Sequence, residues 1–169
     1  MAFWFGGCLG SFINVLAYRI PREQSIVFPG SRCPRCRRPI AFYDNVPVLS
    51  WLWLRGRCRR CRKPISPRYP LIEGLMAALS LGLWTHWRTQ PLWAAAVILA
   101  TGALLAVALI DWETYTIPDV LSFGLLAGGL LAAPINPYLA RAAWYASVGS
   151  SLLGAGMGFL MCWGTAAAG

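Results

Sequence analysis

The stretch from residue 92 to 110, LWAAAVILATGALLAVALI, runs for nineteen positions without a charged side chain. A helix of about 20 apolar residues is long enough to cross the hydrocarbon core of a bilayer. The whole chain is similarly apolar, since 57% of its 169 residues are hydrophobic and only 12% are charged. Soluble domains have about 45–50% apolar and about 25% charged residues. The sequence therefore predicts an all-α polytopic membrane protein.

Apolar stretches alternate with polar ones along the chain, which predicts about five transmembrane helices. Pro21 should end the first of them, because proline cannot continue a helix. The expected spans are residues 3–18, 71–84, 92–110, 120–133 and 142–164. We therefore divide the chain into a first transmembrane helix (1–20), a polar insert (21–70) and a transmembrane helical domain (71–169).

The basic residues are concentrated in the insert. Thirteen of the fifteen Lys and Arg residues lie between Arg19 and Arg68. Such a segment can bind nucleic acid or acidic lipid, or it can set membrane orientation. Short loops rich in Lys and Arg stay on the cytoplasmic side of a membrane, so we expect a cytoplasmic insert. Alternation of the spans then places residues 111–119 on the same face.

The insert carries a repeated cysteine motif, RCPRCRRPI at 32–40 and RCRRCRKPI at 57–65. Two C-x2-C pairs at this separation predict a tetrahedral zinc site with four thiolate ligands, which leaves no open position for catalysis. Two disulfides are the alternative, which a reducing cytoplasm disfavours. The expected zinc ligands are Cys33, Cys36, Cys58 and Cys61, and the arginines Arg35, Arg37, Arg59 and Arg60 would offset their negative charge.

The loop between the two cysteine pairs, AFYDNVPVLSWLWLRGR, is apolar and rich in tryptophan. A nucleic-acid surface would interleave basic and aromatic residues, so no nucleic-acid partner is expected. The run Trp51–Leu54 instead indicates contact with the membrane interface, where tryptophan is favoured. Two other readings stay open: a non-enzymatic membrane scaffold stapled by zinc, and a membrane-tethered nucleic-acid binder.

Three of the six acidic residues lie in DWETYTIPD, residues 111–119. Asp111 directly follows the nineteen-residue apolar run, and an ionisable group at such a place is a functional candidate; the alternative is a solvated helix end. A pair of aspartates can hydrolyse a peptide when one is ionised and the other protonated. Pro118 prevents one unbroken helix through Asp111 and Asp119, so we expect the partner of Asp111 on another helix.

Several blocks of this sequence resemble the bacterial prepilin peptidases. They are GSFINVLAYRIPR (10–22), the double C-x2-C, DNVPVLSWLWLRGRC (44–58), PISPRYPLIE (64–73) and IDWETYTIPD (110–119). The resemblance implies an inner-membrane aspartic peptidase that cleaves the leader from type IV prepilins and type II secretion pseudopilins. It also implies N-methylation of the new N-terminus with S-adenosylmethionine. The first catalytic aspartate of the family corresponds to Asp111, with Asp119 as the second choice.

The sequence departs from this family in one respect. The family's second catalytic aspartate lies in a Gly-x-Gly-Asp motif, and this chain has neither that motif nor any acidic residue after Asp119. We therefore expect a chain truncated at its C-terminus, with an incomplete peptidase domain and no peptidase activity in isolation. No glycine-rich loop marks a site for the methyl donor, and Glu73 is the candidate residue for binding it. Asn14, polar in an apolar helix, is expected to bond a neighbouring helix.

Overall fold

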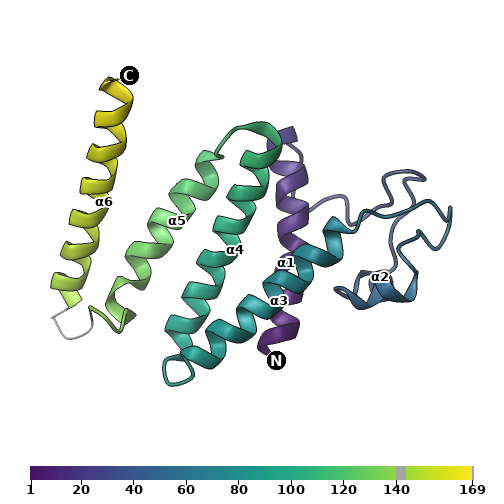
Figure 1. Cartoon of the computed structure of the whole chain (residues 1–169), viewed down its shortest axis with the longest axis horizontal. Coiled ribbons are helices and arrows are strands. Elements are labelled where there is room, and N and C mark those ends of the chain that lie inside the picture. The colour runs from purple at the N-terminus through teal and green to yellow at the C-terminus, as the bar shows by residue number, and fades with distance from the viewer. Residues whose placement is uncertain (140–143, 169) are drawn as a thin grey trace.

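The computed structural model describes residues 1–139 and 144–168. Within these residues the regular structure is helical, without a β-strand, which confirms the all-α prediction. The described residues form five long helices. The cysteine-containing insert, which joins the first two of them, lies to one side of the helices (Figure 1). The α-helices are α1 (Ala2–Arg19), α2 (Leu49–Trp53), α3 (Arg68–His86), α4 (Pro91–Thr114), α5 (Asp119–Ala132) and α6 (Trp144–Ala168). Short 3-10 helices cover Ile20–Arg22, Phe42–Asn45 and Ala133–Ile135.

The long helices correspond to the five expected spans. Among the described residues, α4 is the helix that is long and apolar enough to cross a membrane by length and composition. Five transmembrane helices therefore remain a prediction. Residues 142–143 of the last expected span lie outside the described residues.

Helix α4 continues further than the sequence predicted. We expected residues 111–119 to form a polar interruption, but the helix runs to Thr114 and includes Asp111 in its last turn. Its last residue, Thr114, bonds its hydroxyl back to the Ile110 carbonyl at 2.9 Å. The helix ends at Tyr115, whose left-handed backbone donates its N–H to the Asp111 carbonyl. Pro118 then separates α4 from α5, as predicted.

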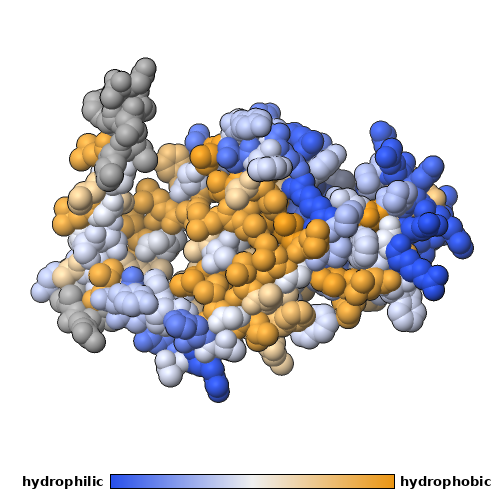
Figure 2. Space-filling model, viewed as in Figure 1, coloured by the Kyte–Doolittle hydropathy of each residue, from blue (hydrophilic) through white to orange (hydrophobic). Residues whose placement is uncertain are grey.

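The core lies where α1, α3 and α4 meet. Ile13, Met76, Ile98 and Ala106 are buried there, with leucine and isoleucine side chains packed around them. Figure 2 shows hydrophobic residues over much of the visible face of the helices, with hydrophilic residues gathered at the far end of the insert. The described part of the molecule therefore combines a small buried core with a large apolar exterior.

Two glycines allow α1 and α3 to approach closely. A Cβ atom at Gly6 would lie 2.6 Å from the Met76 carbonyl oxygen, and one at Gly10 would lie 2.7 Å from the Cα atom of Glu73. Gly6 and Gly10 are four residues apart, the G-x-x-x-G spacing that lets two helix backbones touch. The glycine spacing is visible in the sequence, but we made no prediction of close helix packing from it.

Replacing Gly10 with alanine is expected to separate α1 from α3 and lower stability. Backbone atoms surround the site and cannot move aside individually, so we expect a loss of about 1–3 kcal/mol from overpacking. Gly82→Ala is the matched control, since a Cβ atom there meets nothing within 4 Å. Thermal unfolding in detergent should show a lower Tm for Gly10→Ala and an unchanged or higher Tm for Gly82→Ala. Equal Tm values for the two variants would contradict the close packing.

Candidate functional site

The two cysteine motifs fold into the same local structure. In the first, the Cys33 N–H donates to the Arg38 carbonyl at 3.0 Å and the Arg37 N–H donates to the Cys33 carbonyl at 2.8 Å. In the second, the equivalent bonds join Cys58 with Lys63 at 2.9 Å and Arg62 with Cys58 at 2.9 Å. Arg37 and Arg62 both have a positive φ, of 56° and 55°. The sequence repeat is therefore a structural repeat of two knuckle turns, each presenting two thiols to the other.

The four sulfurs converge on one point. The Sγ atoms of Cys33, Cys36, Cys58 and Cys61 all lie within 4.8 Å of one another, and those of Cys33 and Cys61 are 3.8 Å apart. A tetrahedral zinc ion with Zn–S bonds of about 2.3 Å holds its sulfurs roughly 3.8 Å apart. The residues therefore fit a four-thiolate metal centre, and no disulfide joins any of these cysteines.

The thiols of this cluster influence one another's ionisation. Burial opposes ionisation of Cys33, but the N–H groups of Cys36 and Arg35 and the neighbouring thiols lower its pKa to about 7. The Lys63 N–H favours the thiolate of Cys61, yet burial and the neighbouring sulfurs raise its pKa to about 11. Four sulfurs this close cannot all carry charge without a cation between them, and a divalent metal provides one.

Arg59 has a different role from the one predicted. We expected it to offset the charge of the thiolates, but it forms an ion pair with Asp44, with N···O distances of 2.6 and 2.7 Å. The hydrogen bonds from Arg59 hold the pKa of Asp44 below its ordinary value. The Arg59 guanidinium also lies 5.5 Å from the Tyr43 ring. Arg59 thus ties the second knuckle to the loop that follows the first.

Glu73 fixes the insert to the helices, and Asn14 joins two of the helices to each other. The Glu73 carboxylate is buried in α3 and accepts the Val48 N–H at 2.7 Å. Neither nearby arginine pairs with Glu73, since Arg68 bonds Glu113 and Arg19 bonds backbone carbonyls of the insert. Asn14 donates to the Tyr69 carbonyl of α3 at 3.4 Å, which confirms its predicted helix-to-helix bond.

Asp111 and Asp119 lie at the same end of the α4–α5 hairpin, on either side of its connection. Both residues are exposed. Asp111 is in the last turn of α4 and Asp119 is the first residue of α5. Among the hydrogen bonds and ion pairs of the described residues, none uses the carboxylate of either aspartate. Both acids are therefore available to an incoming group.

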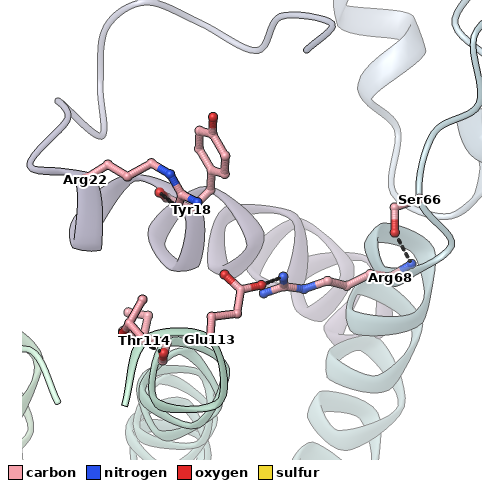
Figure 3. Close-up of polar contacts among 7 residues, drawn as sticks. Tyr18, Arg22, Ser66, Arg68, Glu113 and Thr114 are labelled. Atoms are coloured by element: carbon pink, nitrogen blue, oxygen red, sulfur yellow. Dashed lines mark hydrogen bonds and ion pairs between the residues drawn. The ribbon is translucent and has the colours of Figure 1, made fainter. Parts of the chain in front are cut away.

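An ion pair joins this end of the hairpin to the start of α3. Arg68 and Glu113 point toward each other between α3 and α4 (Figure 3). Beyond them, Arg22 stacks on Tyr18 with its guanidinium 4.2 Å from the ring centre. An exposed ion pair of this kind contributes about 0–1 kcal/mol to the free energy of folding. The Arg68–Glu113 pair therefore matters more for where it lies than for stability. It joins the end of the insert to residues 111–119 at one end of the helices.

Comparison with known proteins gives the family. Residues 4–87 match the family model described as the bacterial peptidase A24 N-terminal domain, and residues 98–169 match the one described as the type IV leader peptidase family. The prepilin leader peptidase/N-methyltransferase of Klebsiella pneumoniae is 39% identical over 95% of this chain and 70% of its own length. The chain belongs to the type IV leader peptidase family. The knuckle turns lie in the first matched region, and Asp111 and Asp119 lie in the second.

Two other relatives with the same name are also similar to this chain over most of its length. The protein of Aeromonas hydrophila is 37% identical over 96% of this chain, and that of Myxococcus xanthus is 43% identical over 94%. The chain spans 62% of the length of the Aeromonas relative and 45% of the Myxococcus relative. No solved structure matches the chain.

Proposed function

We propose that the protein is an aspartic peptidase of the bacterial inner membrane that cleaves the leader peptide of type IV prepilins and type II secretion pseudopilins. One observation carries this proposal. The carboxylate of Asp111, which has no partner among the described residues, is exposed in the last turn of α4, within the segment that matches the type IV leader peptidase family. A carboxylate in that place can reach a peptide bond at the membrane surface.

The membrane arrangement is part of the proposal. Only 28% of the apolar window of α4 is buried within the molecule, whereas the core helix of a soluble protein is mostly buried. Lipid would cover the remainder. We propose five spans, with 1–20 as the first, the insert 21–70 in the cytoplasm and 71–169 as the transmembrane peptidase domain. The arginines of the insert favour this orientation.

Asp111 acts in this account as one carboxylate of an aspartyl dyad. Its ionised form takes a proton from water while a protonated partner polarises the peptide carbonyl, a division of roles that close approach of two carboxyls produces. Asp119 is the second choice for the catalytic position. The basic leader of the substrate would approach the acidic end of the hairpin, and its apolar helix would lie beside α4 and α5.

Zinc and S-adenosylmethionine complete the proposal. When bound, zinc supplies folding free energy and no chemistry, because four cysteine ligands close its coordination. The methyl donor is inferred from the relatives, which are named as N-methyltransferases. A cavity of about 260 Å³ lies between α1 and the insert, lined by Ser11, Phe12, Arg19 and Asn45 among others. Glu73, our candidate for binding the donor, does not line it and already accepts the Val48 N–H.

The test is cleavage of a prepilin in bacteria whose own prepilin peptidase gene is deleted. The complete reading frame that encodes this chain should restore leader removal, seen as a shift of the pilin band on a gel. Accumulation of the unprocessed precursor, with the protein present in the membrane fraction, would contradict the proposal.

A further inference from the structure

The segment 46–54, which comprises α2 and its flanking residues, is part of the polar insert in sequence. In the structure it packs against α1 and α3 and exposes apolar side chains. We propose that it is embedded in the cytoplasmic leaflet of the bilayer, where lipid acyl chains cover α2. The inference rests on the membrane orientation of the proposed function. It adds a lipid-binding element to a part of the chain that the orientation rule assigns to the cytoplasm.

Pro47 contacts α1 far from the end of the helix that we place at the membrane surface. Pro47 is buried against α1, with its Cβ atom 3.2 Å from the position that a Cβ atom of Gly7 would take. Gly7 lies roughly 18 Å along the helix from Arg19, at a rise of about 1.5 Å per residue. Half of a bilayer is roughly 20–22 Å thick with its headgroup layer, and the inner roughly 15 Å of this is hydrocarbon. If Arg19 marks the membrane surface, Pro47 lies at the depth of the acyl chains.

Helix α3 gives a consistent depth. Glu73, which holds the Val48 N–H, follows Arg68 by roughly 8 Å of helix. Ala77, whose Cβ atom is 3.9 Å from the same Gly7 position, follows Arg68 by roughly 14 Å. The segment therefore reaches well below the level of the Arg68–Glu113 pair.

The exposed surface of α2 consists largely of apolar side chains. Leu52 is 57% exposed and Trp53 is 83% exposed, and Leu49 and Phe42 are exposed beside them. Large apolar side chains gathered on one exposed patch indicate a partner. Figure 2 shows that the hydrophobic surface of the helices continues onto the lower side of the insert, away from its hydrophilic far end. The patch is thus continuous with the surface that lipid covers on the spans.

Backbone groups of the segment are bonded within the protein, as a lipid environment requires. Val46 accepts the Ser50 N–H at 3.1 Å and the Ser50 hydroxyl at 2.7 Å. Val48 accepts the Leu52 N–H at 3.1 Å, while its own N–H bonds the buried carboxylate of Glu73 at 2.7 Å. The buried carboxylate of Glu73 thus provides an acceptor for a backbone donor at this depth.

Charge complementarity favours lipid over a protein partner. The residues that follow α2 include the exposed Arg55, Arg57, Arg59 and Arg60. Arginine near a membrane surface binds anionic headgroups while its stem lies along the apolar layer. An apolar helix followed by such a basic segment matches the layers of the cytoplasmic leaflet.

The test places the photo-crosslinking residue p-benzoylphenylalanine at Trp53 of the protein in native bacterial membranes. Irradiation should yield phospholipid adducts, detected by mass spectrometry. Leu104, on the exposed face of α4, is the lipid-facing control, and Arg35, exposed in the first knuckle, is the water-facing control. We expect the yield of lipid adducts at position 53 to be close to that at position 104. We expect no lipid adduct at position 35.

The adducts at positions 53 and 104 together distinguish a wrong placement of α2 from a wrong membrane topology. Adducts at 104 but not at 53, or adducts of 53 with another protein, would overturn the embedding of α2 while leaving the membrane topology intact. Absence of lipid adducts at both 53 and 104 would overturn the proposed topology, and with it this inference.

Discussion

Replacing Asp111 with asparagine is expected to abolish leader cleavage. Asparagine keeps the size of the side chain but cannot accept a proton from water, and general acid–base catalysis contributes about 100- to 10,000-fold to a rate. Because Asp111 is exposed and its carboxylate has no partner among the described residues, the fold should tolerate the change. The measurement is the rate of prepilin cleavage by membranes that contain the complete gene product.

Two neighbouring acids serve as matched controls for Asp111. Asp119→Asn removes the other free carboxylate at this end of the hairpin, and Glu113→Gln breaks the ion pair with Arg68. Both should cleave far faster than Asp111→Asn. Loss confined to Asp119→Asn would move the catalytic role to that residue. Cleavage at an unchanged rate in all three variants would show that none of these acids is catalytic, whereas a non-enzymatic scaffold would show no cleavage even in the unaltered protein.

Replacing Cys33 with serine is expected to release the metal and unfold the insert. Metal binding to a structural cysteine site provides roughly 10–16 kcal/mol of folding free energy, far more than the small insert gains from packing. We expect one zinc ion per chain in the unaltered protein by elemental analysis and none in the variant. Trypsin should then cut the arginine-rich insert rapidly.

Cys8 offers the control for this experiment, since it is a free, exposed cysteine outside the cluster. Cys8→Ser should retain the zinc ion and the resistance to trypsin. The alternative of two disulfides predicts a different pattern: no metal in the unaltered protein, and no reaction of Cys33, Cys36, Cys58 and Cys61 with a thiol reagent until a reductant is added.

Much of this structure could be predicted from composition and spacing. The apolar stretches predicted the positions of the long helices, because a helix is the conformation that satisfies the backbone over such a run. The paired C-x2-C motifs predicted the convergence of four sulfurs, because each knuckle turn fixes two of them. The break at Pro118 was also predicted, because its ring excludes a continuing helix.

Other features depend on contacts between distant parts of the chain. Nothing in the sequence around Glu73 indicates that it bonds Val48, twenty-five residues away. The pairing of Arg68 with Glu113 likewise required α3 and α4 to be placed side by side. The end of α4 was missed because polarity was taken as a helix boundary, whereas the left-handed residue Tyr115 ends the helix.

Removal of the leader from prepilins is the central activity that we propose for this protein. The most direct measurement is the intact mass of pilin made by bacteria in which the complete reading frame encoding this chain is the only source of a prepilin peptidase. We predict a pilin that has lost its leader and gained one methyl group at the new N-terminus, and an unprocessed precursor in the Asp111→Asn strain. A precursor of full mass in both strains, with the protein folded and carrying zinc, would contradict the claim.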